Sequence, residues 1–270
     1  MKPPKTKRAF TLVELLVVVG IMGILAAITV PAFNSIKKGD ATLAATRQLA
    51  DDVAFARQLA IARHTTVYMI FVPENFWSSP VYTALPPIEK DKGRQLYDKQ
   101  LTGYTFVTRR SVGEQPGRIA PRYLTSWRSL PEGVFISPSK FGSPGQFVRI
   151  TDPSTSRYYD VYGFSTNNII PFPSEGAPAS AGAYVTLPYI AFNYLGQLTQ
   201  DGVSPSGRDE YIPLARGAVA YARDAAKVPV ASAPNVSERP PGNSTNAFNL
   251  IHIDWLTGRA RVERQEIGGS

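Results

Sequence analysis

The sequence predicts an α+β fold, in which one long N-terminal helix packs on an antiparallel β-sheet with long Pro- and Gly-rich loops. An apolar run opens the chain after a short basic segment, and a helical stripe of small and apolar residues follows that run. The remainder alternates short β-rich runs with turn residues. The 23 prolines and 21 glycines among 270 residues favour a β-rich domain with many turns over a helical bundle.

The apolar run extends from Phe10 to Phe33, and Glu14 is its only charged residue. Its roughly 24 residues form a helix of about 36 Å, which exceeds the hydrocarbon core of a bilayer, about 30 Å. Four basic and no acidic residues precede the run: Lys2, Lys5, Lys7 and Arg8. Because positive flanks stay in the cytoplasm, we expect a single membrane-spanning segment whose N-terminus is cytoplasmic and whose following chain is exported.

The composition limits the chemistry and the partners of the chain. The formal net charge is +8, but the first eight residues supply four of the positive charges, which leaves 25 basic against 21 acidic residues, or +4. The exported part is therefore only mildly basic. The chain has no cysteine, which excludes disulfides, thiolate metal sites and a cysteine nucleophile.

Two ordinary interpretations of the apolar run remain open. Ala26 and Ala27 imitate the small-residue site at which a secretory signal is cleaved, although such a signal has a shorter apolar region of about 7–15 residues. A plain membrane anchor is the other interpretation. Glu14 argues against both, because a carboxylate inside an apolar helix costs about 2.5–3.5 kcal/mol on insertion scales unless it has a partner.

The segment Arg8–Val17, RAFTLVELLV, resembles the prepilin leader motif of type IV pilins and type II secretion pseudopilins. The resemblance implies that a prepilin peptidase cuts between Ala9 and Phe10 and methylates the new N-terminus at Phe10. Glu14 then becomes the fifth residue of the mature chain, a position that this family reserves for glutamate. Pro31 matches the family's helix-kinking proline. The family nearly always has Gly before the cut, and Ala9 departs from that pattern.

The resemblance implies a pilin-like fold and a division of the chain into a leader at residues 1–9, a transmembrane and assembly helix at 10–36, and a periplasmic globular domain at 37–270. It implies a structural subunit of a type II secretion pseudopilus or a type IV pilus, with no cofactor. The implied partners are the prepilin peptidase, other pilins or pseudopilins and the inner membrane. In a filament, the carboxylate of Glu14 can pair with the terminal ammonium of a neighbouring Phe10 and so set the axial register.

A second helical pattern follows the apolar run. Small and apolar residues recur at spacings of four and three: Ala45, Leu49, Val53, Ala56 and Ala60. This stripe predicts one long helix over about residues 11–63, weakened at Pro31 and Gly39, whose second half packs on a sheet. The adjacent Asp51 and Asp52 lie off the stripe, and we expect both to be solvated.

The rest of the chain reads as short strands between turns. Candidate strands are Val67–Val72, Tyr104–Thr108, Val134–Ser137, Phe147–Ile150, Tyr158–Tyr162, Ile190–Phe192, Ala247–Asp254 and Ala260–Glu263. We interpret Asn75–Gly103 as an insertion, and Ser165–Gly182 and Val228–Asn246 as surface loops. The helix-to-strand passage Leu49–Val72, the segment Ile190–Gln197 and the terminal hairpin, with its turn near Leu256–Gly258, resemble the GspH/FimT group of minor pseudopilins.

No constellation for catalysis emerges, and we expect neither an enzyme nor a metal site. The chain has two histidines, His64 and His252, and both are expected to be satisfied structural residues. No nucleophile elbow, zinc-binding helix or phosphate-binding loop is present. Asp152 and Asp160 are too isolated to act as an acid and base pair.

The alternative function is a DNA- or ligand-binding minor pilin at a filament tip. Some minor pilins of the FimT kind take up DNA through arginines near the C-terminus. Candidate residues here are Arg259, Arg261 and Arg264, with Trp255 as a base-stacking side chain. Glu263 and Glu266 dilute this positive charge, which favours a solvated hairpin surface over a DNA site.

Overall fold

A computed structural model of the protein describes residues 12–110, 121–152, 156–173, 184–246 and 249–264. Within these ranges the side chains of residues 26–40 and 184 are outside the description. The chain divides into two compact units, Met1–Ala41 and Thr42–Ser270. The predicted boundaries at residues 9 and 36 stay predictions.

One helix, α1, extends from Leu12 to Ala62 and so confirms the predicted long helix. It is helical across Pro31 and Gly39 without interruption. It ends where His64 takes a left-handed conformation with φ of 47°, after which Thr65 N donates to Ala60 O at 3.2 Å. In the Thr42–Ala62 part the predicted stripe is confirmed, because its five residues are fully buried: Ala45, Leu49, Val53, Ala56 and Ala60.

The first sheet has the strand order β11-β10-β1-β2-β3, with β4 also paired to β2, and every pair is antiparallel. Its strands are β1 (Val67–Phe71), β2 (Gly103–Thr108), β3 (Arg122–Tyr123), β4 (Arg128–Ser129), β10 (Tyr189–Phe192) and β11 (Leu198–Thr199). Strands β1, β2 and β10 confirm three sequence predictions. They are buried along their whole length, as expected for strands at the centre of a covered sheet.

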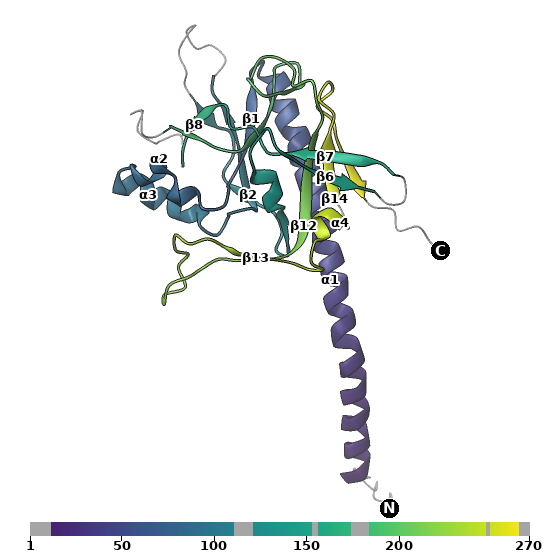
Figure 1. The fold of residues 1–270 in the computed structure, drawn as a ribbon. Helices are drawn as coiled ribbons and strands as arrows, with labels where there is room; N and C mark the ends of the chain where they lie inside the picture. The colour runs from purple at the N-terminus through teal and green to yellow at the C-terminus, as the bar shows by residue number, and fades with distance from the viewer. Residues whose placement is uncertain (1–11, 111–120, 153–155, 174–183, 247–248, 265–270) are drawn as a thin grey trace, which may run out of the picture. The chain divides into compact units, whose positions relative to one another are not determined.

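The second sheet has the order β13-β12-β14-β15, and β5 also pairs with β12 (Figure 1). Its strands are β5 (Val134–Ile136), β12 (Glu210–Ala220), β13 (Asn235–Glu238), β14 (Asn249–Ile253) and β15 (Ala260–Arg264). Strand β12 is the longest strand and was not predicted. It joins three partners in succession, with β14 along its first part, then β5, then β13.

The remaining described elements are two hairpins and several short helices. They are β6 (Phe147–Thr151), β7 (Tyr158–Tyr162), β8 (Ile169–Pro171), β9 (Tyr184–Thr186), η1 (Phe76–Ser78), α2 (Pro80–Thr83), α3 (Pro87–Gly93), η2 (Arg94–Leu96), η3 (Pro138–Phe141) and α4 (Asn243–Asn246). The predicted loop Ser165–Gly182 was partly wrong because it contains β8. The predicted loop Val228–Asn246 was partly wrong because it contains β13 and α4. The segment Asn75–Gly103 carries four helical turns, and its aromatic residues Phe76, Tyr82 and Tyr97 join a buried cluster.

The expectation that Asp52 is solvated was wrong. Asp52 is 7% exposed, its carboxylate forms an ion pair with Arg128, and it accepts a hydrogen bond from Tyr104 Oη at 2.5 Å. The neighbouring Asp51 is exposed, as predicted. The two residues differ because α1 faces β2 and β4 on the side of Asp52, where Phe55 also packs edge-on against Phe106 of β2 at 5.5 Å.

Candidate functional site

The first candidate site is the start of α1. Every side chain described from Leu12 to Leu25 is exposed, including Glu14. The apolar members of this segment include Leu12, Val13, Leu15, Leu16, Val17, Val18, Val19, Ile21, Met22, Ile24 and Leu25. A continuous apolar surface of this kind marks a site that lipid or another protein covers.

The predicted processing residues Ala9 and Phe10 lie outside the described residues, as does the side chain of Pro31. The roles predicted for these residues and for Glu14 stay predictions. Among the residues whose side chains are described, no helix combines the length and the apolar character needed to cross a membrane.

The second candidate site is the end of the Thr42–Ser270 unit at which α1 stops. Here the turn after β10 meets the turn between β14 and β15, and both rest on α1. Leu198 N donates to Trp255 O at 3.0 Å, and Arg57 Nε donates to Thr257 O at 2.6 Å. A Cβ at Gly258 would lie 2.0 Å from Gly196 O, so the two turns touch through backbone. The structure therefore brings together the two turn segments that the sequence singled out separately.

The four proposed nucleic-acid residues do not form one basic surface. Arg259, Arg261 and Arg264 are exposed and Trp255 is half-buried. Arg261 Nε lies 2.7 Å from Glu263 Oε1, so that its charge is already paired. Arg264 lies an odd number of residues from Arg261 along β15, and alternation along a strand directs the two side chains to opposite faces.

His252 is a satisfied structural histidine, as predicted. Its ring is buried, with Nε2 at 2.8 Å from Asp209 Oδ2, and Nδ1 accepts a hydrogen bond from Arg261 Nε at 2.9 Å. The ring of Tyr211 packs against it with centroids 4.6 Å apart. The same expectation was wrong for His64, whose side chain is exposed at the end of α1. Its backbone conformation, and not a buried ring, is what this position contributes to the fold.

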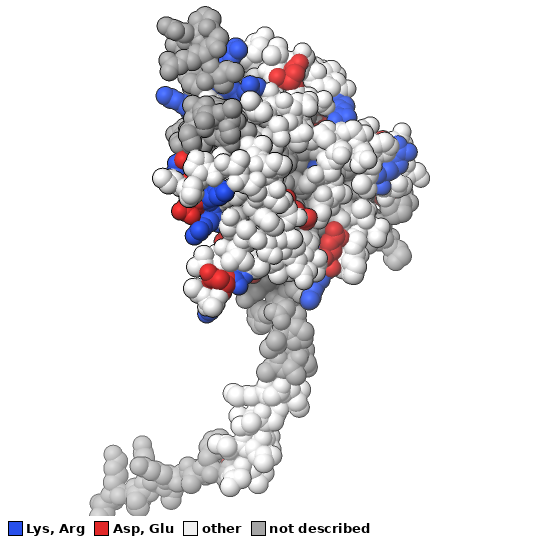
Figure 2. Space-filling view, turned by 60° about the vertical axis from the view of Figure 1, so that its left-hand side comes forward, with Lys and Arg blue, Asp and Glu red and all other residues white. Residues whose placement is uncertain are grey.

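Charges of both signs are interspersed on the surface. On the face shown in Figure 2, blue and red side chains alternate, and no broad area is of one sign. In the part of the chain that the structure describes, no group of three or more His, Asp or Glu side chains could hold a metal ion. The described part of this face therefore has no continuous anion-binding stripe.

Comparison with known protein families matches residues 4–30 to the prokaryotic N-terminal methylation motif. No curated protein and no solved structure matches the chain. The match covers most of the predicted leader, the predicted cleavage region and most of the apolar run, and it confirms the predicted resemblance to type IV pilins and pseudopilins. It indicates a precursor of the pilin or pseudopilin type, and it implies processing by a prepilin peptidase and assembly with other pilins. Membership of the GspH/FimT group stays a prediction.

Proposed function

We propose that the protein is a structural subunit, a pseudopilin or minor pilin, of a filament assembled at the inner membrane. The observation that carries this proposal is the methylation motif at residues 4–30, which includes the α1 segment Leu12–Leu25 with its exposed apolar surface. The subunit serves a type II secretion pseudopilus or a type IV pilus. No enzymatic activity is part of the proposal, because the motif is one of subunits that act by assembly.

The proposed anchor is the run Phe10–Phe33, which crosses the inner membrane before assembly with its N-terminus in the cytoplasm. The domain that follows lies in the periplasm. The sequence supports this arrangement through the length of the run and the basic residues before it.

In the filament, we propose that Glu14 pairs with the methylated ammonium of Phe10 on a neighbouring subunit. A charge in a low-dielectric bundle is tolerable when it is paired and costly when it is not. Subunits that miss the correct axial register therefore leave a charge unpaired, and the apolar contacts alone do not supply this selectivity.

The test is the mature N-terminus of the protein extracted from membranes of cells that carry a prepilin peptidase. Intact-mass and N-terminal sequence measurements should give a chain that begins at N-methylated Phe10. The Ala9→Gly variant is the control for recognition, because it restores the residue usual in the family. A mature chain that begins near Ala27 in both proteins would overturn the proposal in favour of a secretory signal.

DNA binding at a filament tip is the second candidate, favoured by the exposure of Arg259 and Arg264. Retention of the full chain on immobilised duplex DNA, measured between low and high salt, tests it. A DNA-binding subunit is released steeply as salt rises, because each neutralised phosphate releases a counterion. Retention at low salt equal to that of an Arg259→Gln/Arg264→Gln variant would remove this candidate.

A further inference from the structure

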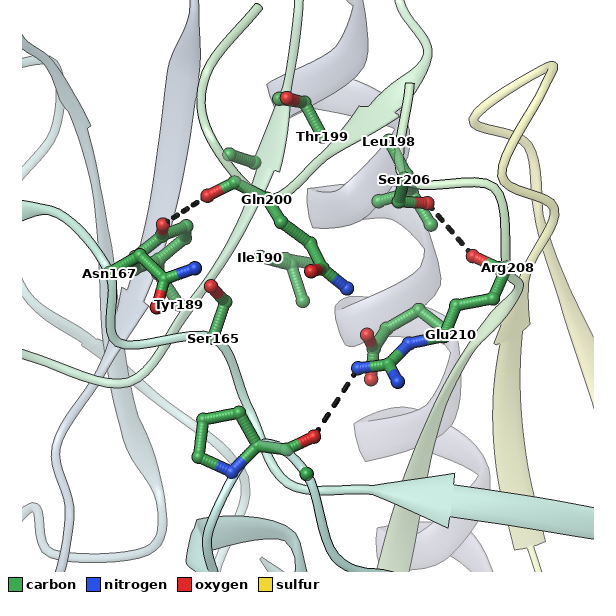
Figure 3. Close-up of a pocket in the computed structure, with 13 residues that line it drawn as sticks. Ser165, Asn167, Tyr189, Ile190, Leu198, Thr199, Gln200, Ser206, Arg208 and Glu210 are labelled. Atoms are coloured by element: carbon green, nitrogen blue, oxygen red, sulfur yellow. Dashed lines mark hydrogen bonds between the residues drawn. The ribbon is translucent and has the colours of Figure 1, made fainter. Parts of the chain in front are cut away.

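A cavity of 290 Å³ lies within the Thr42–Ser270 unit, between β10 and β11 of the first sheet and the start of β12 in the second. Ile190, Ala191 and Leu198 form its apolar wall. Three polar side chains, those of Ser165, Gln200 and Arg208, point toward the same space in Figure 3. Polar residues outnumber apolar ones in the rest of the lining, which also includes Asn167, Thr199, Ser206 and Glu210. Polar groups that converge beside apolar side chains can orient a small ligand.

Two polar atoms of this wall are buried without a hydrogen-bond partner among the described residues. They are Ser165 Oγ and Arg208 Nε. Buried polar groups in native proteins nearly always have a partner, because an unmade hydrogen bond leaves the cost of desolvation uncompensated. A hydroxyl and a guanidinium N–H can both donate, so the group that satisfies them accepts hydrogen bonds.

Two charged side chains line the cavity, those of Arg208 and Glu210, and Glu210 is paired with Lys140. Lys140 is fully buried, forms an ion pair with Glu210 and donates to Tyr162 O at 2.6 Å. Burial lowers the pKa of Lys140, and the nearby charge of Arg208 lowers it further. Arg208 is therefore the charge of the lining that has no ion-pair partner among the described residues, and an anion would supply one.

Arg208 is held in place for such a role. Its guanidinium carbon lies 3.9 Å from the centroid of the Tyr162 ring, and Nη2 donates to Pro144 O at 3.4 Å. Among the ion pairs of the described residues, none includes Arg208, since Lys140 already occupies Glu210. A guanidinium fixed by stacking loses little side-chain entropy when it binds a carboxylate.

We propose that this cavity binds a short monocarboxylate, whose oxygens accept hydrogen bonds from Arg208 and Ser165 and whose alkyl group packs on Ile190 and Leu198. A single arginine and an apolar wall suit one carboxylate better than a phosphate, which carries more charge and more acceptors. The carboxylate belongs either to a free acid or to the C-terminal residue of a polypeptide, and both present the same group.

The test is isothermal titration calorimetry on the full chain in detergent micelles, with empty micelles as the blank. Sodium isobutyrate and isobutyramide have the same shape and differ in charge. We expect the acid to bind at least about tenfold more tightly, since hydrogen bonds to charged groups are the stronger ones. Equal affinities for the two compounds, or no heat from any carboxylate, would overturn the proposal.

A second pair of probes separates the two sources. These are acetyl-Ala-Gly-Gly-Val with a free carboxylate and the same peptide with a C-terminal amide. Tighter binding of the peptide acid than of isobutyrate assigns the site to a polypeptide end. Binding of isobutyrate without binding of the peptide acid assigns it to a free acid.

Variants of the cavity residues test whether the measured heat of binding comes from this cavity. Arg208→Gln should weaken isobutyrate binding about tenfold or more, and Ser165→Ala, which removes only one hydroxyl, should weaken it by a few-fold. Arg223→Gln is the matched control, because Arg223 is exposed and does not line the cavity. Should Arg208→Gln not fold, the Ser165→Ala result decides. Unchanged affinity in every folded cavity variant would refute the assignment.

Discussion

Replacement of Asp52 by Asn should destabilise the Thr42–Ser270 unit more than its position on a helix surface suggests. Asp52 accepts a hydrogen bond from Tyr104 Oη at 2.5 Å and forms an ion pair with Arg128. Gln48 Nε2 in turn donates to Tyr104 Oη at 2.7 Å. Asparagine keeps the shape of the side chain and removes the charge that both donors approach.

The magnitude follows from burial. Removing one partner of a buried ion pair costs about 3–5 kcal/mol, but exposed pairs are worth about 0–1 kcal/mol. The Asp52 side chain is 9% exposed and that of Arg128 is 38% exposed, so water screens one side of the pair. We therefore expect a loss of about 2–3 kcal/mol, equivalent to roughly 5–10 °C in Tm for a domain of this size.

The assay is urea unfolding of the full chain in a mild detergent, followed by circular dichroism, with thermal unfolding alongside. Asp51→Asn is the matched control, because it makes the same chemical change one residue earlier on an exposed side chain. It should alter the free energy of unfolding by less than about 0.5 kcal/mol. An Asp52→Asn/Arg128→Met double-mutant cycle isolates the pair. Equal stabilities of the Asp51 and Asp52 variants, or zero coupling in the cycle, would refute the reasoning.

Three further outcomes follow, one from the proposed pairing of Glu14 in the filament and two from local geometry. Glu14→Val should leave membrane levels unchanged but abolish cross-linking into filaments, since a broken buried pair costs about 3–5 kcal/mol; wild-type cross-linking would remove the pairing role. Gly258→Ala should destabilise the fold by about 2 kcal/mol or more, because φ at Gly258 is +62° and a Cβ there would lie 2.0 Å from Gly196 O. Gly207→Ala is the control, since a Cβ at Gly207 would meet open space, and it should cost about 1 kcal/mol. Equal urea midpoints of the two variants would contradict the contact between Gly258 and Gly196. Backbone hydrogen bonds lower the pKa of Asp201 to about 2, so its charge stabilises the fold above pH 4 and loses that effect as pH falls toward 2. The Tm of Asp201→Asn should be below that of wild type at pH 6 and equal to it at pH 2. A difference in Tm that does not change with pH would exclude the charge as its cause.

The elements that the sequence predicted well are those in which one local pattern decides the structure. The stripe from Ala45 to Ala60 has helical period and small residues, and all five of its members are fully buried. The turn at Gly258 was predictable because a left-handed residue between two β-rich runs calls for glycine.

Strand β12 was missed because its sequence breaks the rules for strands. Pro213 lacks the N–H that a central strand normally donates, and Gly217 lacks a side chain to pack. Strand β12 tolerates Pro213 and Gly217 because it pairs with three different strands in succession. Pro213 O accepts from Ser137 N at 3.0 Å, and Gly217 has no room for a Cβ, which would lie 1.9 Å from Ser237 O. Both exceptions depend on strands far away in the sequence.

The N-terminal site and the cavity differ in the same respect, which is whether a local sequence pattern is enough to predict them. The N-terminal site is contiguous, so a basic segment, an aromatic residue and a glutamate at fixed spacing were enough to predict it, and the methylation motif spans these residues. The cavity takes Ser165 from a predicted loop, Arg208 from an unassigned segment and Glu210 from the strand that was missed. The local sequence around these residues contains no motif that predicts a site. What distinguishes them is a buried polar atom without a hydrogen-bond partner, or a buried charge. Such properties arise only when segments meet in the folded domain. In this protein the proposed assembly role can therefore be predicted from the sequence, whereas the proposed ligand binding can be inferred only from the packing of the two sheets.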